Sequence, residues 1–230
     1  MLNSNRIKRI PIALILIVLL GTLLRFYAID QLPPGLFGDE AVEGLDALDV
    51  LAGNWQIWFH AHLGREPLFV YLVAASYFFG SISAFATRLP AILAGIVTIP
   101  VAYWLTREWG VQLFSAERAR RIAILTAALL AISFWHLELS RNAHRDILLP
   151  LVQAVGYAVL WRAIRLTPNP LRFARPPSPS PVEIAAGNTG EVEGGKGDRS
   201  EALFALAGTI LGLAIYTYSP GRFVGIFVAA

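Results

Sequence analysis

The sequence contains no cysteine and little charge, and both shortages exclude classes of function. Without thiols the chain has no disulfide framework and no thiolate chemistry. Only 15% of the 230 residues are charged, 56% are hydrophobic, and the mean hydropathy is +0.57. The formal net charge is only +3, and the arginines gather near the ends of apolar segments, which argues against nucleic-acid binding. The composition predicts an all-α, polytopic membrane protein.

Apolar segments long enough to matter recur along the chain. We expect spans at about 10–28, 89–106, 122–139, 147–164 and 202–218, and an incomplete one at 223–230. A cleaved signal peptide is the alternative for the first, but no small-residue cleavage site follows it. Residues 168–200 are rich in Pro, Gly and Ser and predict a disordered cytoplasmic loop. Because the sequence stops inside an apolar run, we expect the N-terminal part of a longer transmembrane domain.

The segment Pro67–Gly80 decides which loops share a side of the membrane. At about 1.5 Å per residue it reaches only about 21 Å, short of a hydrocarbon core of about 30 Å. If it does not cross, the Arg-rich loops after 89–106 and 147–164 both lie in the cytoplasm, as the positive-inside rule requires. We therefore predict a re-entrant or interfacial helix here, inside an outer loop at 30–88.

This topology places three polar clusters at the outer face. The first is Asp39 and Glu40, at the start of a predicted amphipathic helix with Val42, Leu45 and Leu48 on one face and Asp39, Glu43 and Asp46 on another. One interpretation makes Asp39 a helix N-cap. The other makes it a general base, with or without a metal, because a partly dry carboxylate has a raised pKa.

The second cluster is SRNAHRD, which contains Arg141, His144, Arg145 and Asp146. Arginines on the outer side suit a lipid phosphate, although contact with lipid headgroups or a local Arg145–Asp146 pair is the alternative. The third cluster contains Tyr216, Tyr218 and Arg222, which are candidates for further phosphate contact or for an aromatic belt.

A metal site has weaker support. His60, His62 and Glu66 have a spacing that could ligate a metal, but polar residues among interfacial aromatics would look the same. A divalent metal is therefore left open, and no cofactor is certain.

The segments GDEAVEGLDALDVLAGNW, GREPLFVYLVAASYFFG, ATRLPAILAGIVTIPVAYWL, SRNAHRDILLP and GLAIYTYSPGRF together resemble the glycosyltransferase family 39-like proteins. These belong to the GT-C superfamily, with the protein O-mannosyltransferases and the lipid A aminoarabinose transferases. The resemblance implies a multi-pass enzyme of the cell (inner or plasma) membrane. It implies transfer of a sugar from a polyprenyl-phosphate donor, usually with inversion, to a lipid, glycan or protein acceptor at the extracytoplasmic face.

The same resemblance assigns residues. Asp39 matches the family's catalytic acidic position, Glu40 its partner, and Asp146 the second acidic position. Arg65 and Glu66 precede Pro67 where relatives often carry His or Lys, so they are candidates for donor contact. The expected phosphate and substrate ligands also include Arg141, His144, Arg145, Tyr218 and Arg222. The alternative is a truncated, non-catalytic membrane module or a remnant of such an enzyme.

Overall fold

A computed structural model describes residues 11–60, 64–167 and 197–217. The described part is helical, and its one β-bridge joins Phe59 and Arg65. Tyr218, Arg222, His62, the run 223–230 and nearly all of the predicted 168–200 loop lie outside the described residues. The helices are α1 (Ile12–Phe26), α2 (Gly38–Leu51), α3 (Pro67–Phe79), α4 (Ala84–Leu113), α5 (Ala116–Ile132), α6 (Phe134–Arg141), the 3₁₀ turn η2 (Arg145–Ile147), α7 (Leu148–Leu166), α9 (Gly197–Leu213) and the 3₁₀ turn η4 (Ala214–Tyr216).

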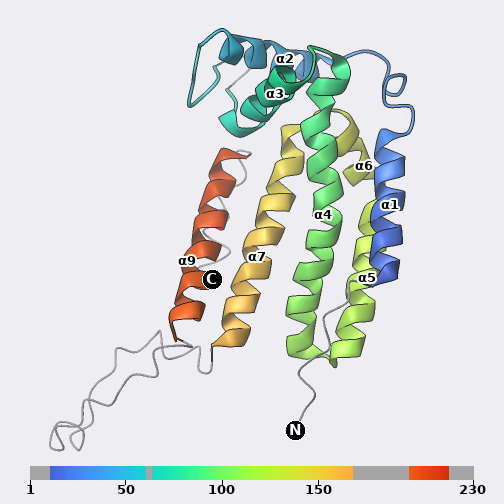
Figure 1. Cartoon of the computed structure of the whole chain (residues 1–230), viewed down its shortest axis with the longest axis vertical. Coiled ribbons are helices and arrows are strands. Elements are labelled where there is room, and N and C mark those ends of the chain that lie inside the picture. The colour runs from blue at the N-terminus through green and yellow to red at the C-terminus, as the bar shows by residue number, and fades with distance from the viewer. Residues whose placement is uncertain (1–10, 61–63, 168–196, 218–230) are drawn as a thin grey trace, which may run out of the picture.

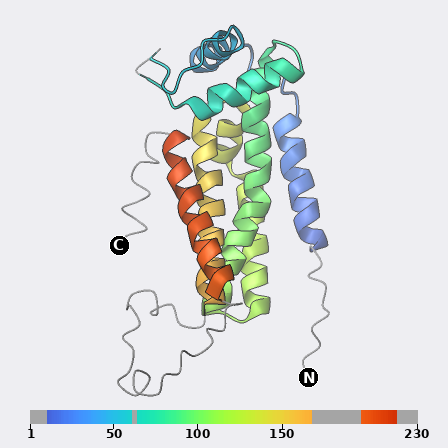
Figure 2. The ribbon, with the colours of Figure 1, turned by 60° about the vertical axis from the view of Figure 1, so that its left-hand side comes forward.

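The helices form an upright bundle with a crosswise layer on one end. Helices α1, α4, α5, α7 and α9 run roughly side by side, whereas α2 and α3 lie across their top in two views (Figures 1 and 2). We call α2, α3 and the described residues between them the α2–α3 layer. The position of α3 across the end of the bundle agrees with the predicted re-entrant or interfacial helix at Pro67–Gly80. A GT-C-type bundle with interfacial helices in its first long loop is the fold that the sequence predicted.

Two helices of the described part are long and apolar enough to cross a membrane, α4 and the continuous Arg145–Leu166 segment. Helices α5 and α6 make a third span if they are taken together, with a 54° bend between them. Helices α1, α3 and α9 are apolar but shorter. The five spans predicted from the sequence coincide in position with α1, α4, α5–α6, α7 and α9.

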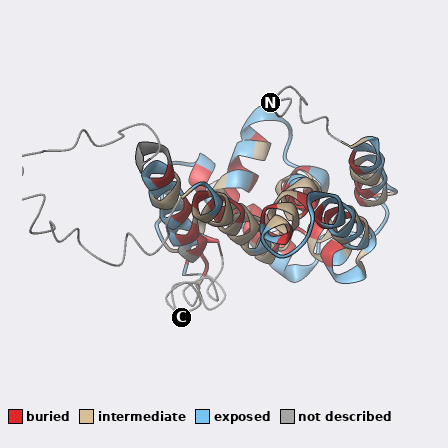
Figure 3. Cartoon of the chain, turned by 90° about the horizontal axis from the view of Figure 1, so that it is seen from below, coloured by how far each residue is buried: buried red, intermediate tan, exposed pale blue. Residues whose placement is uncertain are grey.

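Small residues allow close packing in the bundle. Ala119, Ala123, Ala127 and Ala131 recur at every fourth position of α5, and all four are fully buried. This is the spacing at which residues share one helix face. A Cβ at Gly110 of α4 would lie 3.1 Å from the Cβ of Ala119, so α4 and α5 approach closely there. Seen along the bundle, buried residues lie between helices and exposed ones on its outside (Figure 3).

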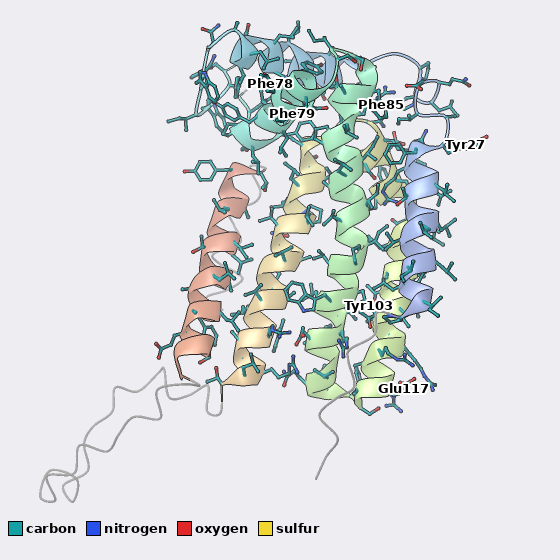
Figure 4. The ribbon with its side chains drawn as sticks, in the orientation of Figure 1. Tyr27, Phe78, Phe79, Phe85, Tyr103 and Glu117 are labelled. Carbon is teal, nitrogen blue, oxygen red and sulfur yellow. The ribbon has the colours of Figure 1, made fainter. Side chains whose placement is uncertain are left out.

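Side chains at the two ends of the bundle differ in kind. Tyr27, Phe78, Phe79 and Phe85 are exposed and lie near the α2–α3 layer (Figure 4). At the other end lies Glu117, which pairs with Arg120 and Arg121 at the start of α5. Exposed aromatic rings gathered at one height are typical of a membrane–water interface.

Candidate active site

The Asp39–Glu40 pair begins α2, but the two carboxylates do different things. The N-cap of α2 is Phe37, so the interpretation of Asp39 as N-cap is wrong. The side chain of Glu40 accepts a hydrogen bond from the Phe37 backbone N–H at 2.9 Å and thereby satisfies a donor at the helix start. Asp39, in the same first turn, is exposed, whereas Glu40 is buried.

Glu40 is held by a bidentate arginine. Arg88, at the start of α4, donates from Nε to Glu40 Oε1 at 2.9 Å and from Nη2 to Glu40 Oε2 at 3.0 Å. Both side chains are almost fully buried. The remaining hydrogen bonds of Arg88 go to the backbone carbonyls of Ile29, Pro33 and Gly35. With every N–H of the guanidinium engaged, this arginine fastens the start of α2 to α4.

The buried face of α2 carries two acids, Glu43 and Asp46, beside the apolar Ala47 and Val50. Glu43 and Asp46 point inward, whereas Leu45 is 61% exposed. The reason is tertiary: arginines from other elements meet the acidic face, and a charge buried in a pair with its countercharge is tolerated where an isolated one is not.

Five charged side chains meet beneath α2, and we call them the ionic cluster: Glu43, Asp46, Arg65, Glu66 and Arg145. Arg145 of η2 reaches Glu43 at 3.2 Å and Glu66 at 3.5 Å. Arg65 lies 3.6 Å from Glu43 and 3.8 Å from Asp46. Arg145 of the second polar cluster therefore lies against α2, the helix that begins at the first cluster, and joins η2 to the α2–α3 layer.

Geometry within the ionic cluster is loose compared with the Glu40–Arg88 pair. Neither Nη1 nor Nη2 of Arg65 has a hydrogen-bond partner among the described residues, although both are buried. Burial raises the pKa of Glu43 to about 7, against the opposing effects of Arg65 and Arg145. The neighbouring charge of Asp46 is a smaller cause that acts in the same direction as burial. Glu43 thus changes charge near neutral pH.

Arg141 has a partner set that the sequence did not suggest. Its Nη1 donates to the carbonyls of Leu24 at 2.7 Å and Arg25 at 3.2 Å, and its Nη2 to that of Leu32 at 2.6 Å. Arg88 and Arg141 together therefore bind six backbone carbonyls, two in the last turn of α1 and four in the connection between α1 and α2. A signal existed in the sequence, because arginines outside the membrane need acceptors, but their partners could not be read from it.

The remaining predicted site residues are less tightly defined. Asp146 and His144 are half-buried, and both adjoin Arg145 at η2. His60 is exposed. The described residues contain no group of three His, Asp or Glu side chains that could hold a metal ion. The roles proposed for Asp146 and His144 stay predictions.

An apolar pocket of about 510 Å³ opens below the α2–α3 layer. Leu72, Ser76 and Phe79 of α3 form one wall. Residues of α4 from Leu89 to Val97 and two residues at the start of α7, Leu148 and Leu151, form the others. Ser76 supplies the hydroxyl of an otherwise hydrocarbon lining. Such a pocket suits a hydrocarbon chain better than a sugar.

Comparison with known proteins supplies the family. The family model described as dolichyl-phosphate-mannose-protein mannosyltransferase matches residues 50–173, more than half of the chain. The chain belongs to this family. The resemblance to glycosyltransferase family 39-like proteins is thereby confirmed. No curated protein and no solved structure matches the chain.

The matched residues run from the last turn of α2 through α7 and so contain Arg65, Arg88, Arg141 and Arg145. Asp39 and Glu40 precede them. As a member of the dolichyl-phosphate-mannose-protein mannosyltransferase family, the protein is a membrane glycosyltransferase of the GT-C type.

Proposed function

We propose that this protein transfers a sugar from a polyprenyl-phosphate donor to an acceptor at the extracytoplasmic face of the cell membrane, with Asp39 as the base. The observation that carries the proposal is the position of an exposed acid, Asp39, in a layer that covers an apolar pocket. A lipid-linked sugar has the same two parts: a hydrocarbon chain and a reactive polar head.

The pocket supports a polyprenyl chain as the donor's tail. Its walls come from α3, α4 and α7, and its upper wall is part of the α2–α3 layer itself. A chain held there has its phosphate end near the layer and its tail toward the bilayer. Binding of the remote tail would hold the reacting sugar in place, which is a productive use of binding energy.

Asp39 supports the chemistry of the transfer. The acceptor hydroxyl gives its proton to Asp39 while its oxygen forms a bond to the anomeric carbon. The bond between that carbon and the phosphate oxygen breaks, and the polyprenyl phosphate leaves with the bonding electrons. A single displacement of this kind inverts the anomeric centre. Both carboxylate oxygens of Glu40 accept hydrogen bonds from Arg88, whereas Asp39 is exposed. Of the two carboxylates, Asp39 is therefore the one that an acceptor can reach.

Positive charge for the departing phosphate is available nearby. Arg65 and Arg145 lie in the ionic cluster, and the two Nη groups of Arg65 have no hydrogen bond among the described residues. Arg141 is a weaker candidate, since three carbonyls already accept from it. Arg222, Tyr218, His144 and Asp146 remain proposed contributors, and a divalent metal remains a proposed aid to phosphate departure.

The orientation follows from charge. The start of α5 and the end of α7 lie at the end of the bundle opposite the α2–α3 layer (Figure 1), and these helix ends carry arginines 118, 120, 121, 162 and 165. The positive-inside rule places that end in the cytoplasm. The α2–α3 layer then faces the outside of the cell, where acceptors are lipids, glycans or exported proteins.

The test is transfer of radiolabelled sugar from synthetic polyprenyl-phosphate donors by the purified protein in proteoliposomes, with and without EDTA. We expect transfer that requires the lipid phosphate and that free sugar phosphate does not replace. Absence of transfer to protein, lipid and glycan acceptors, with the donor bound or not, would favour the alternative, a non-catalytic membrane module.

Because the chain has no native cysteine, single cysteines report the orientation directly. A cysteine at exposed position Asp49 should react with an impermeant maleimide added outside whole cells, whereas one at Arg121 should react only after permeabilisation. The reverse pattern would contradict the proposed side of the active site.

A further inference from the structure

A buried arginine lies inside the bundle, away from the ionic cluster. Arg25, in the last turn of α1, is 0% exposed. A charged group buried at this depth is costly, and a neutral residue would fill the position at less cost. Its hydrogen bonds go to neutral acceptors: Gly21 O at 2.8 Å, Ala131 O at 3.4 Å and His136 Nδ1 at 2.6 Å.

Two of these acceptors lie on opposite sides of the bend between α5 and α6. Helix α5 ends at Ile132, so its last carbonyls, including that of Ala131, have no partner within the helix. Helix α6 begins at Phe134 and carries His136 in its first turn. Arg25 donates to Ala131 with Nη1 and to His136 with Nη2, so one guanidinium bridges the break.

The imidazole has only one protonation pattern that fits this contact. Arginine donates and never accepts, so Nδ1 of His136 must be the acceptor and carries no proton. The proton of the neutral ring is then on Nε2. His136 therefore serves Arg25 as an uncharged acceptor, and the pair does not place two positive charges side by side.

Space for the guanidinium is made by glycine. A Cβ at Gly95 of α4 would lie 2.9 Å from Arg25 Nε and 2.6 Å from the Cβ of Ser140 on α6. A Cβ at Gly21 would lie 3.2 Å from Arg25 Nη1. All three distances are shorter than ordinary van der Waals contacts. Helix α4 thus leaves room at one position for both the bridging arginine and the bent helix that it holds.

The bent helix leads directly to the site. Helix α6 ends at Arg141, which donates back to the carbonyls of Leu24 and Arg25 at the end of α1. Four residues later, Arg145 reaches Glu43 and Glu66. Helices α1 and α6 are therefore joined by two arginines, Arg25 of α1 and Arg141 of α6, each of which donates to the other helix. The position of Arg145 depends on the direction of α6.

We propose that Arg25 is a positioning residue that bridges the broken α5–α6 span and so holds Arg145 and Asp146 at the α2–α3 layer. The bridge itself is independent of the proposed function, whereas its effect on transfer rests on that function. If α6 straightened from its 54° bend, its far end would move by about 10 Å, given eight residues at ~1.5 Å each. Removing the bridge should therefore displace groups at the site.

The first experiment measures the bend. Spin labels are placed on cysteines at Arg118 of α5 and Glu138 of α6, two exposed positions in a chain that has no native cysteine. We expect a single narrow distance distribution for the otherwise unchanged chain and a broadened or lengthened one for Arg25→Leu. The matched control is Arg121→Leu, an arginine of the same span whose side chain is 77% exposed. An unchanged distribution in Arg25→Leu would overturn the proposal.

A second pair of variants addresses the acceptor and keeps the test valid if Arg25→Leu does not fold. His136→Asn keeps an uncharged acceptor oxygen on α6, whereas His136→Leu removes it. We expect His136→Leu to broaden the distribution and His136→Asn to restore most of the native one. Equal behaviour of the two variants would overturn the bridge, because a purely packing role would not distinguish them.

Transfer assays then connect the bridge to the site. We expect turnover to fall at least tenfold in Arg25→Leu and His136→Leu, and less than threefold in His136→Asn and Arg121→Leu. A changed distance distribution with full turnover would overturn the positioning role. If the unsubstituted protein shows no transfer, the proposed function fails while the distance measurements still decide the bridge.

Discussion

Two buried ionic sites lie side by side under α2 and differ in how completely they are satisfied. Arg88 donates two hydrogen bonds of 2.9 and 3.0 Å to Glu40, and its other N–H groups donate to backbone carbonyls. In the ionic cluster, three of the four ion pairs are 3.5 Å or longer. Both nitrogens at the tip of Arg65 have no hydrogen-bond partner among the described residues.

This difference indicates that the Glu40–Arg88 pair is structural, whereas the ionic cluster can change its charge and its contacts. A fully hydrogen-bonded buried ion pair is not easily rearranged, because separating its partners leaves an unpaired charge in a low-dielectric interior. A cluster with long ion pairs and a carboxylate whose pKa is near 7 can change its charge and its partners at modest cost. The first suits the job of holding the fold, and the second suits contact with a substrate that brings its own charge.

The largest effect should come from removing the Glu40–Arg88 ion pair. Arg88→Leu leaves Glu40 buried without its countercharge and frees the loop before α2, so we expect a loss of about 3–5 kcal/mol in the free energy of unfolding. Thermal unfolding of the purified protein in detergent measures it. Arg121→Leu, at an exposed position, is the control, and an equal, small change in both variants would contradict the structural role of Arg88.

A smaller, pH-dependent effect is expected for the ionic cluster. The folded-state pKa of Glu43 is raised to about 7, so its protonated form stabilises the fold fully below its ordinary pKa of 4.5. That stability is lost as pH rises through about 7, on the order of 3 kcal/mol in total.

Glu43→Gln fixes the neutral form and should flatten this dependence. We expect the melting temperature of the variant at pH 8 to equal or exceed that of the unsubstituted protein, measured by the same unfolding assay from pH 4.5 to 8. A variant that is less stable at pH 8 and keeps the native pH dependence would show that Glu43 is not the titrating group.

A substitution at Gly44 should have an intermediate effect on the free energy of unfolding, because α2 packs closely against α3 at this residue. A Cβ there would lie 2.7 Å from the hydroxyl of Tyr77, which itself bonds the hydroxyl of Thr87 at 2.6 Å. Gly44→Ala should cost about 1–3 kcal/mol. Tyr77→Phe removes the oxygen in question, so a double-mutant cycle should recover part of the loss, and strict additivity would contradict the contact.

The smallest effect is expected at the far end of the bundle. Glu117 pairs with Arg120 and Arg121 at the surface, and all three side chains are about half exposed or more. Exposed pairs contribute little. Glu117→Gln should leave the melting temperature unchanged within error, and a clear drop would show that surface pairs here matter as much as buried ones.

Charge counting and segment length predicted the part of the fold that depends on the membrane. The short length of 67–80 and the arginines on the opposite side were enough to place α3 across the bundle, because lipid imposes a length and a charge asymmetry. The periodicity of α2 predicted a helix with two faces, but burial on that helix depends on partners from other elements. Leu45 is exposed and Glu43 buried because Arg65 and Arg145 arrive from elements distant in sequence.

The site was predicted in outline and not in its contacts. The acid pair and the SRNAHRD cluster were found, but the division between exposed Asp39 and bound Glu40 depends on Arg88, forty-eight residues further along the chain. Arg141 donates to carbonyls whose positions no sequence pattern encodes, and its predicted contact with phosphate stays a prediction. The sequence gives Arg25 no special role, because a single arginine at the end of a span is ordinary in a sequence and unusual only once its burial is known.

The most direct test of the account compares Asp39→Asn with Glu40→Gln in the same preparation, for both sugar transfer and thermal unfolding. The account predicts that Asp39→Asn keeps the native melting temperature and loses transfer by about 10²–10⁴-fold, as expected for removal of a general base. Glu40→Gln should lower the melting temperature. Native transfer rates in Asp39→Asn would contradict the account, as would equal destabilisation in both variants.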